Sequence, residues 1–401
     1  MKRKTLAVTI FIGLITWSCA SNSEKRGHIG MINFPESLNQ IGVIPLSTVA
    51  SGIEYIPLET SDESLVGTIG HQVFLDNGLI YIKDNTGLIK IFDLKGNFVR
   101  KIDRVGRGPQ EYLQSSILSL SPSNGNILLT GNGEIKEYNS LGRFIRRVEI
   151  PKMDEYRTFS SLMFSENRFV APLFKTKYER EYCAVIYDSL ANIQQMIPTP
   201  ELYGTEQQQT TNQNDGEVVR FMPVIEAKVF RYGDMVRIFY PETTEIFTTN
   251  GYGNLDTVYV INYGEYRLPG GVVNDYTERG KYISPHNFIE SKNHLFINAS
   301  LRNVMEDSPL FTGYFVFNKR INETRLLLDN QKKRNGFTDD MMGGPQFWPK
   351  TISGERILIS FAYSEALIEH AENNEVSDKL KNILSNLRDD SNPVVILVHL
   401  K

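Results

Sequence analysis

The residues best suited to bind a ligand lie together in the loop Gly106–Tyr112, which has the sequence GRGPQEY. Arg107 can donate several hydrogen bonds and Glu111 can accept them, so this pair suits a polar ligand. One interpretation is that Arg107, Glu111 and Tyr112 form a binding loop at one mouth of a central channel. The other, which we favour, is structural: the glycines allow a sharp crossover, the proline stiffens it, and Glu111 and Tyr112 hydrogen-bond to neighbouring backbone.

No pattern in the sequence indicates catalysis. The histidines lack metal-binding spacings such as H-x-H or H-E-x-x-H, and there is no G-x-S-x-G motif. Asp84-Asn85 and Asp339-Asp340 are rich in oxygen ligands, but neither belongs to a D-x-D-x-D-G calcium loop. We therefore predict no catalytic residue, metal or cofactor, while noting that spacing does not reveal ligands gathered from distant segments. The six histidines are His28, His71, His286, His294, His370 and His399.

The N-terminus has the features of an export signal. Three basic residues at positions 2–4 precede the short apolar segment Leu6–Trp17, and Cys19 follows at the cleavage position. This end resembles a bacterial lipoprotein signal, so we predict a signal peptide over residues 1–18 and a lipid on Cys19. The alternative is a plain signal peptide with an incidental cysteine. Residues 19–37 are predicted to be a tether, polar at least as far as Gly30.

The charge and cysteine content exclude several classes of protein. The formal net charge is −4, and removal of the three positive charges of residues 1–18 makes it −7. An acidic chain without basic runs argues against nucleic acid and against electrostatic binding to membranes, so attachment would come from the lipid. Cys183 then has no partner for a disulfide, and we interpret it as a small buried hydrophobe.

The segment around the GRGPQEY loop is repeated along the chain. Ile89–Ile102 (IKIFDLKGNFVRKI) matches Ile135–Val148 (IKEYNSLGRFIRRV) after a shift of 46 residues. Both copies have alternating apolar residues, an aromatic residue followed by Asp or Asn, and a turn glycine, which together predict a β-hairpin. Weaker copies occur at Ala184–Met196, Glu245–Ile261 and Tyr314–Leu328.

Repeats of forty or more residues with about four strands each are typical of β-propeller blades. With an irregular last unit, we predict an all-β, six-bladed β-propeller over residues 38–401. The N-terminal segment Gly42–Leu58 is available to complete the last blade beside Pro393–Leu400. One short helix is predicted at Glu375–Arg388, inserted before the last strand and capped by Ser377 or Asn374. The polar segment Glu206–Glu217 is predicted to be a solvated loop.

Three motifs carry a family resemblance. The hairpin followed by GRGPQEY resembles the NHL-type propeller repeat. With Ile56–Thr60 (IPLET) and Asp390–Lys401 (DSNPVVILVHLK), it resembles the six-bladed β-propeller lipoproteins of Bacteroidetes over roughly residues 38–401. The resemblance implies a secreted, lipid-anchored propeller without a settled activity, and it suggests a glycan-uptake context. In that group surface-exported members carry several acids after the cysteine, whereas Ala20–Lys25 has only Glu24, which favours the periplasmic face of the outer membrane over the cell surface.

The sequence is compatible with two kinds of function. The first is a binding or scaffold module, tethered to the outer membrane, with a protein or a glycan-related ligand on one face of the ring. The second is a metal-dependent lyase or hydrolase with its site in the central channel. Trp348 is the only tryptophan after residue 18; we interpret it as a packing anchor rather than a sugar platform. Gly343-Gly344-Pro345 is interpreted as a crossover related to GRGPQEY.

Overall fold

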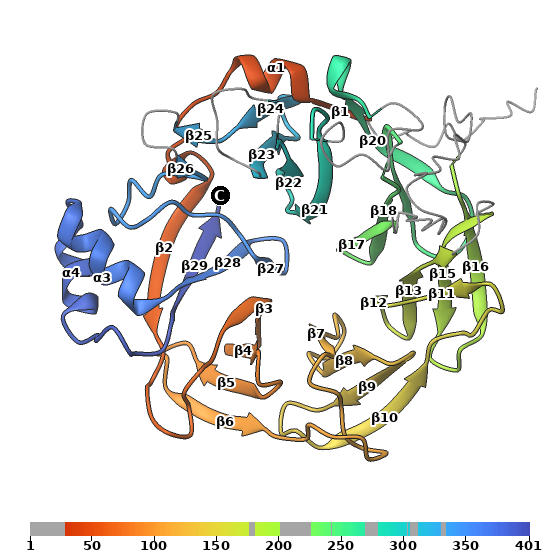
Figure 1. Ribbon diagram of the computed structural model, residues 1–401, viewed down its shortest axis with the longest axis horizontal. Coiled ribbons are helices and arrows are strands. Elements are labelled where there is room, and N and C mark those ends of the chain that lie inside the picture. Colours follow the sequence, from red (N-terminus) through yellow and green to blue (C-terminus); the bar gives the residue numbers. More distant parts are fainter. Residues whose placement is uncertain are drawn as a thin grey trace, which may run out of the picture.

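The computed structural model describes residues 29–175, 181–200, 226–241, 243–268, 280–302, 304, 312–329 and 334–401. These residues form a six-bladed β-propeller, in which antiparallel sheets are arranged around a central axis (Figure 1). The predicted fold class is therefore confirmed. The predicted signal peptide, Cys19 and the predicted loop Glu206–Glu217 lie outside the described residues.

Each blade has four strands that run from the axis to the outer edge, in an order that follows the chain except in the last blade. Blade 1 contains β3 (Ile69–Asp76), β4 (Leu79–Asp84), β5 (Ile89–Asp93) and β6 (Phe98–Ile102); blade 2 contains β7 (Ile117–Leu120), β8 (Ile127–Gly131), β9 (Glu134–Tyr138) and β10 (Phe144–Glu149). Blade 3 contains β12 (Leu162–Ser165), β13 (Arg168–Pro172), β15 (Tyr182–Asp188) and β16 (Ile193–Pro198); blade 4 contains β17 (Lys228–Tyr232), β18 (Met235–Phe239), β19 (Glu245–Thr249) and β20 (Asp256–Asn262). Blade 5 contains β21 (Ser284–Glu290), β22 (His294–Ser300), β23 (Thr312–Asn318) and β24 (Glu323–Leu326); blade 6 contains β27 (Thr351–Ser353), β28 (Ile357–Ala362), β29 (Val394–Leu400) and β2 (Ala50–Pro57). Two short pairs, β11 (Tyr156–Arg157) with β14 (Phe174–Lys175) and β25 (Leu328–Asp329) with β26 (Arg334–Asn335), flank the blades.

The ring closes in blade 6, where strands from both ends of the chain share one sheet. β2 is the outermost strand and pairs antiparallel with β29, with Ile53 opposite Val398 and Ile56 opposite Val395. The predicted closure is therefore confirmed. Without this pairing, β2 and β29 would each have a strand edge with unpaired backbone N–H and C=O groups.

The hydrophobic core is distributed around the ring rather than gathered at its centre. Six clusters of buried side chains each join two neighbouring blades. Between blades 1 and 2, for example, Ile91 and Tyr81 pack with Leu129 and Tyr138. A four-stranded sheet has two apolar faces, and radial packing of blades buries both of them.

Residues 30–39 form a strand and a helix that pack on blades 4 and 5. β1 (Gly30–Asn33) adds a fifth strand to blade 4 by pairing parallel with β20. α1 (Phe34–Asn39) follows, with Asn33 as its N-cap, and the fully buried Phe34 ring lies 4.7 Å from that of Phe315 in blade 5.

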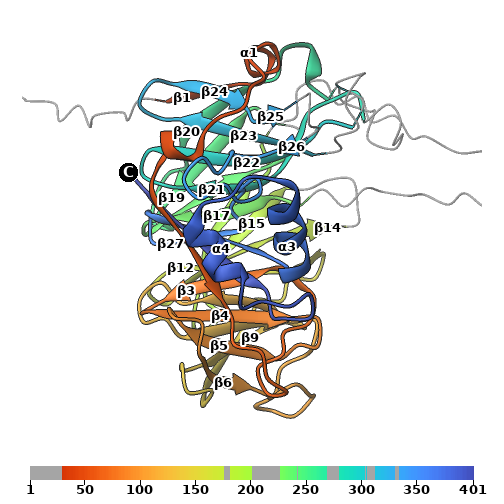
Figure 2. The ribbon, with the colours of Figure 1, turned by 90° about the vertical axis from the view of Figure 1, so that its left-hand side faces the viewer.

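Two helices, not one, precede the last strand. α4 (Asp378–Leu384) lies within the predicted Glu375–Arg388, and the predicted cap Ser377 accepts a hydrogen bond from the Leu380 N–H. α3 (Ser364–Asn373) was not predicted, because its only fully buried apolar side chain is Leu367. Both helices lie on the outer side of blade 6 (Figures 1 and 2).

The ring has two ends with different connections. In each blade the first-to-second and third-to-fourth strand turns lie at one end, which we call the hairpin end. The second-to-third strand turns and the links between blades lie at the other, the crossover end. Figure 2 shows α3 at the crossover end, opposite the C-terminus, which follows β29 at the hairpin end.

The predicted hairpin chemistry is present at the hairpin end. The Asp93 carboxylate accepts hydrogen bonds from the Lys95 and Asn97 N–H groups at 2.8 and 2.9 Å. Asn139, Asp188 and Asn318 accept equivalent bonds in blades 2, 3 and 5. These side-chain acceptors fix the turn, so the repeated Asp or Asn is a structural residue.

Blade 3 departs from the pattern at the turn glycine. Gly96 and Gly142 have φ of +83° and +75°, whereas blade 3 has Ala191 at the equivalent position with φ of +63°. A residue with a Cβ is strained in this left-handed region, so the turn of blade 3 is less stable than those of blades 1 and 2.

We predict that Ala191→Gly raises the free energy of unfolding by about 0.5–1 kcal/mol, since relief of strain exceeds the greater flexibility of glycine in the unfolded chain. Gly96→Ala should lower it by about 1–3 kcal/mol, because a Cβ there would lie 1.9 Å from the Pro57 carbonyl oxygen. Urea unfolding followed by circular dichroism measures both. A loss of stability in Ala191→Gly would contradict the account of strain.

Candidate functional site

The GRGPQEY loop is the crossover from β6 in blade 1 to β7 in blade 2. Its two ends are joined by backbone hydrogen bonds, from the Gly106 N–H to the Tyr112 carbonyl and from the Tyr112 N–H to the Arg104 carbonyl, both 2.9 Å. The buried Tyr112 hydroxyl donates to the Ile102 carbonyl at 3.0 Å. Burial raises the pKa of Tyr112, so the phenol stays protonated and remains a donor. Tyr112 therefore holds the crossover.

Glu111 folds back beneath the loop. The Gly108 N–H donates to its carboxylate at 2.8 Å, and a Cβ on Gly106 would lie 2.0 Å from the same oxygen. The two glycines are thus required because the carboxylate approaches the backbone closely, and not because of a positive φ. The structural interpretation describes Glu111 and Tyr112 correctly.

Side chains of blade 2 hold the backbone of the GRGPQEY loop in place. Lys136 on β9 donates to the Gly108 carbonyl at 3.2 Å and to the Glu111 carbonyl, and it forms an ion pair with Glu134 at 3.1 Å. The Tyr138 hydroxyl donates to the Gln110 carbonyl at 2.8 Å. Lys136 is only 7% exposed, so a buried cation fixes the loop backbone against the blade. Sequence reasoning did not identify Lys136, although it occupies the same repeat position as Lys90.

A cavity of about 350 Å³ opens between this loop and the β8–β9 turn. The predicted residues Arg107, Glu111 and Tyr112 all line it. Arg107 is exposed and makes no hydrogen bond or ion pair with any residue that the structure describes. Its guanidinium therefore remains available to a ligand, and the binding interpretation of Arg107 stays a prediction. The other polar lining residues are Ser116, Asn132, Glu134 and Lys136.

The cavity combines donors and acceptors of both charges. Arg107 supplies donors in a planar fork, while Glu111, Glu134 and Asn132 supply acceptors, and Leu113 and Leu129 add apolar wall. Its volume lies at the lower end of the range for small-ligand sites. The arrangement can hold a polar ligand through hydrogen bonds, and nothing in it positions a nucleophile beside a general base.

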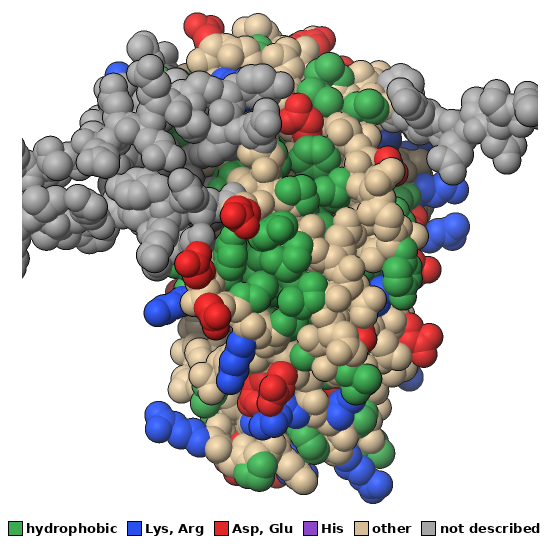
Figure 3. All heavy atoms as spheres, turned by 90° about the vertical axis from the view of Figure 1, so that its right-hand side faces the viewer, with side chains coloured by type: hydrophobic (Ala, Val, Ile, Leu, Met, Phe, Trp, Pro, Cys, Tyr) green, Lys and Arg blue, Asp and Glu red, His purple; other side chains and the backbone are tan. Residues whose placement is uncertain are grey.

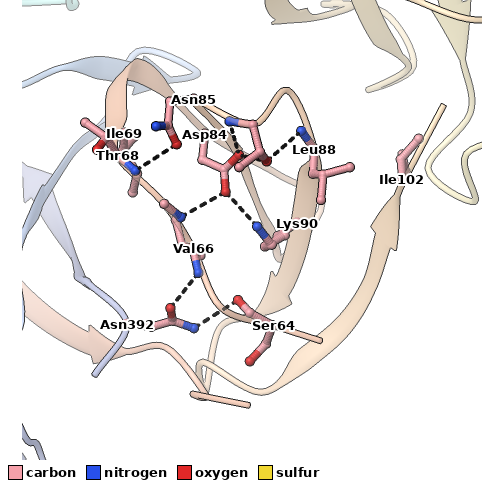
Figure 4. Close-up of polar contacts among 12 residues, drawn as sticks. Ser64, Val66, Thr68, Ile69, Asp84, Asn85, Leu88, Lys90, Ile102 and Asn392 are labelled. Carbon is pink, nitrogen blue, oxygen red and sulfur yellow. Dashed lines mark hydrogen bonds and ion pairs between the residues drawn. The ribbon is translucent and has the colours of Figure 1, made fainter. Parts of the chain in front are cut away.

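The predicted oxygen-rich loop at Asp84 forms a polar latch between the β2–β3 link and blade 1. The Asp84 carboxylate accepts hydrogen bonds from the Gly67 N–H at 2.9 Å and from Lys90 at 2.6 Å (Figure 4). Burial would raise the pKa of Asp84, but the bonds from Lys90 and Thr86 outweigh it and hold the pKa below its ordinary value. Asp84 is therefore an ion-paired structural carboxylate.

The same latch extends to blade 6. Asn392, just before β29, accepts from the Val66 N–H at 2.7 Å and donates to the Ser64 carbonyl at 3.0 Å (Figure 4). Residues 58–68 form the link from β2 to β3, so the latch ties the closing blade to blade 1. Asn392 lies 326 residues from Val66 in sequence, which is why no local motif reveals its part of the latch.

A second buried polar network joins blades 4 and 5 and was not predicted. The Glu290 side chain, fully buried, accepts from Arg237 at 2.9 Å, from Lys319 at 2.6 Å and from the Tyr259 hydroxyl at 2.6 Å. Burial lowers the pKa of Lys319 despite the attraction of Glu290. Because every member has a partner, the network is a structural clamp between blades.

The described histidines do not converge. The His370 ring lies 2.9 Å from the Gly343 carbonyl, and the His399 ring lies 2.7 Å from Glu54, at different places in blade 6. Burial lowers the pKa of His294 to about 4, so its ring is neutral at pH 7. Within the described ranges, no group of three or more His, Cys, Asp or Glu side chains is arranged to hold a metal ion.

Three further interpretations can be compared with the structure. Trp348 is buried, donates to the Asn298 side chain at 2.6 Å and stacks on Tyr314 at 4.5 Å, so it is a packing anchor. Cys183 is buried, and burial raises the pKa of its thiol to about 12, as suits a small core residue. Gly344 lies in the link from blade 5 to blade 6, where the Asp339 carboxylate accepts from its N–H at 3.0 Å. This loop is thus a crossover related to GRGPQEY.

These features define the chain as a closed six-bladed propeller with a small polar cavity at its crossover end. It belongs to the family described as Domain of unknown function (DUF4934), whose model matches residues 29–399. That model is not the NHL repeat, so the NHL part of the resemblance stays a prediction. None of the described helices is both long and apolar enough to span a membrane.

Solved structures support the fold. A Bacteroides fragilis protein named as a putative exported protein has 17% identity and a TM-score of 0.65, with 92% of this chain and 99% of that chain covered. A member of the DUF4221 family from Bacteroides vulgatus has 13% identity and a TM-score of 0.47, with 88% and 97% covered, which is too weak to add to the argument. No curated protein matches the chain.

Proposed function

We propose that the protein is a binding or scaffold module of the cell envelope, and that its ligand binds in the cavity beside the GRGPQEY loop. The observation that carries the proposal is the exposed Arg107 guanidinium, which lines the cavity and has no partner among the described residues. Arginine side chains at binding sites form planar, paired hydrogen bonds with ligand oxygens.

The surrounding structure supports binding because it holds the loop in one conformation before a ligand arrives. Lys136, Tyr138 and Glu111 fix the loop backbone on both sides of Arg107. A preorganised site loses less conformational entropy on binding, which raises affinity for a small ligand. The ring is thus the scaffold and the crossover loop is the recognition element.

The chemistry of the cavity favours a glycan-related ligand or an oxygen-rich segment of a protein partner. Sugar hydroxyls both donate and accept, and they can engage Arg107 together with the acceptors Glu134 and Asn132. The alternative of a metal-dependent lyase or hydrolase has no supporting observation in the part of the chain that the structure describes. Nucleic acid is not proposed, because the chain is acidic overall.

An array of immobilised oligosaccharides tests the glycan ligand. We expect wild-type protein to bind one class, and Arg107→Ala to weaken that binding by about tenfold or more, since a hydrogen bond to a charged group is lost. Arg143→Ala is the matched control, because Arg143 is also exposed but lies at the hairpin end. Glu111→Ala is unsuitable, since it would also release the Gly108 backbone.

Two outcomes would contradict this proposal in different ways. Binding that survives Arg107→Ala unchanged would show that the cavity is not the binding site. An array on which wild-type protein binds nothing would remove the glycan ligand and leave only the protein partner.

We also propose that a lipid on Cys19 anchors the protein to the outer membrane, at its periplasmic face. The support is the sequence of residues 1–19 together with the likeness to a Bacteroides protein named as exported. We expect the wild-type protein to stay with the membrane fraction through repeated washing and Cys19→Ala to be washed into the soluble fraction, because acyl chains supply the durable attachment. Equal retention of the two proteins would refute lipid anchoring through Cys19.

A further inference from the structure

The hairpin end of the ring carries exposed hydrophobic side chains in successive equivalent turns, although not at the same position of each turn. In blades 1 to 5, the turn between the third and fourth strands presents one large apolar side chain to solvent. These side chains are Leu94 (46% exposed), Leu141 (53%), Leu190 (80%), Tyr252 (66%) and Ile321 (64%). We call them the rim tips. Their recurrence in successive blades places them around one end of the molecule, since equivalent turns occupy equivalent places in a propeller.

The outer strands add to this surface. Val99, Ile145 and Ile193 follow the turns of blades 1, 2 and 3 and are also exposed. Together with Ile29 and Met31 beside blade 4, ten of the fifteen large hydrophobic side chains exposed among the described residues lie at or next to the hairpin end. Figure 3 shows a further hydrophobic patch on the outer side of the ring, between its two ends and not at the hairpin end, with charged groups around it.

The charges near the rim tips are of both signs. Lys95 and Arg143 lie in the turns of Leu94 and Leu141, are exposed, and have no ion-pair partner among the described residues. The turn carboxylate of Asp93 is engaged by its own turn amides, and its hydrogen bonds, led by that from Asn97, lower its pKa. Glu166, Asp234 and Asp256 are also exposed in turns at the hairpin end. Because charges of both signs are present there, the apolar tips rather than charge would carry contact with a bilayer interface.

The direction of the N-terminal chain points to the same end. β1 runs parallel to β20, which begins at the hairpin end, so the chain runs from the hairpin end toward the crossover end as it passes Gly30. The Met31 N–H donates to Asn322 in the blade 5 turn at 2.8 Å. Twenty-eight residues precede Ile29, and their apolar segment Leu6–Trp17 and Cys19 are the parts of the chain most suited to a membrane.

We infer that the hairpin end rests on a lipid bilayer surface, with the rim tips inserted at the interface and the cavity of Arg107 facing away from it. A flat and laterally fluid surface accepts several separate tips at once. A protein interface instead buries a continuous patch of roughly 800 Å² on each partner, and the rim tips are separated by polar turns. The inference does not depend on the identity of the cavity ligand.

Vesicle binding tests this inference with matched variants. The protein is the chain from Ile29 onward, which contains all six blades, their closure and the six core clusters of the described ring. The vesicles are phosphatidylethanolamine and phosphatidylcholine, which carry no net charge. The rim variant combines Leu94→Ser, Leu141→Ser and Leu190→Ser. The control combines Val43→Ser, Leu65→Ser and Phe159→Ser, which are comparably exposed but belong to segments of the crossover end.

We expect co-sedimentation of the wild-type chain with the vesicles. The rim variant should lower the partition coefficient by about tenfold or more, since three apolar side chains no longer leave water, and the control should change it by less than about twofold. Circular dichroism melting confirms that both variants are folded.

Three outcomes would overturn the inference: no binding of the wild-type chain, equal loss in both variants, or a dimer in solution that only the rim variant dissociates. The last would show that the rim tips contact a second copy of the chain. None of these results bears on the oligosaccharide array, so failure here is distinct from failure of the proposed function.

Discussion

Closure of the ring by β2 is the interaction on which the rest of the structure depends. β2 comes from the N-terminal part of the chain and β29 from the C-terminal end, so blade 6 forms only when these two distant segments pair. This long-range pairing costs chain entropy and is repaid by the apolar contacts of blade 6 with its two neighbours. The Asp84 and Asn392 latch then secures the link from β2 to blade 1. Closure also sets the path of the N-terminal chain, which must pass blades 4 and 5 before it reaches β2, and β1 and α1 are packed on those blades.

A closed ring of this kind separates its two ends chemically. Links between blades are long enough to fold back and form a cavity, as the GRGPQEY loop does around Glu111. Hairpin turns are short and are fixed by Asp or Asn, so they can only present the side chain at their tip. The cavity with Arg107 and the rim tips therefore lie on opposite ends because of the strand order, and the two proposed contacts do not compete for the same surface.

The sequence predicted those features that repeat or that follow local rules. The Asp93 and Asn139 hairpins, the closing strand and the Ser377 cap could be inferred because each leaves a pattern within a few residues. Features built from distant residues could not. Glu290 accepts hydrogen bonds from Arg237 on β18, from Tyr259 on β20 and from Lys319 in the turn after β23. Lys136 reaches the GRGPQEY loop from the neighbouring blade, at a distance in sequence that no local motif covers. α3 was missed because few of its side chains are buried.

Fluorescence from a single label at each end tests most directly whether the two ends have different contacts. Leu190→Cys and Phe159→Cys would each carry a polarity-sensitive dye, with the native Cys183 protected by burial. On addition of vesicles, the account predicts a blue shift for the label at position 190 and no shift at position 159. A shift at both positions, or at 159 alone, would contradict the account.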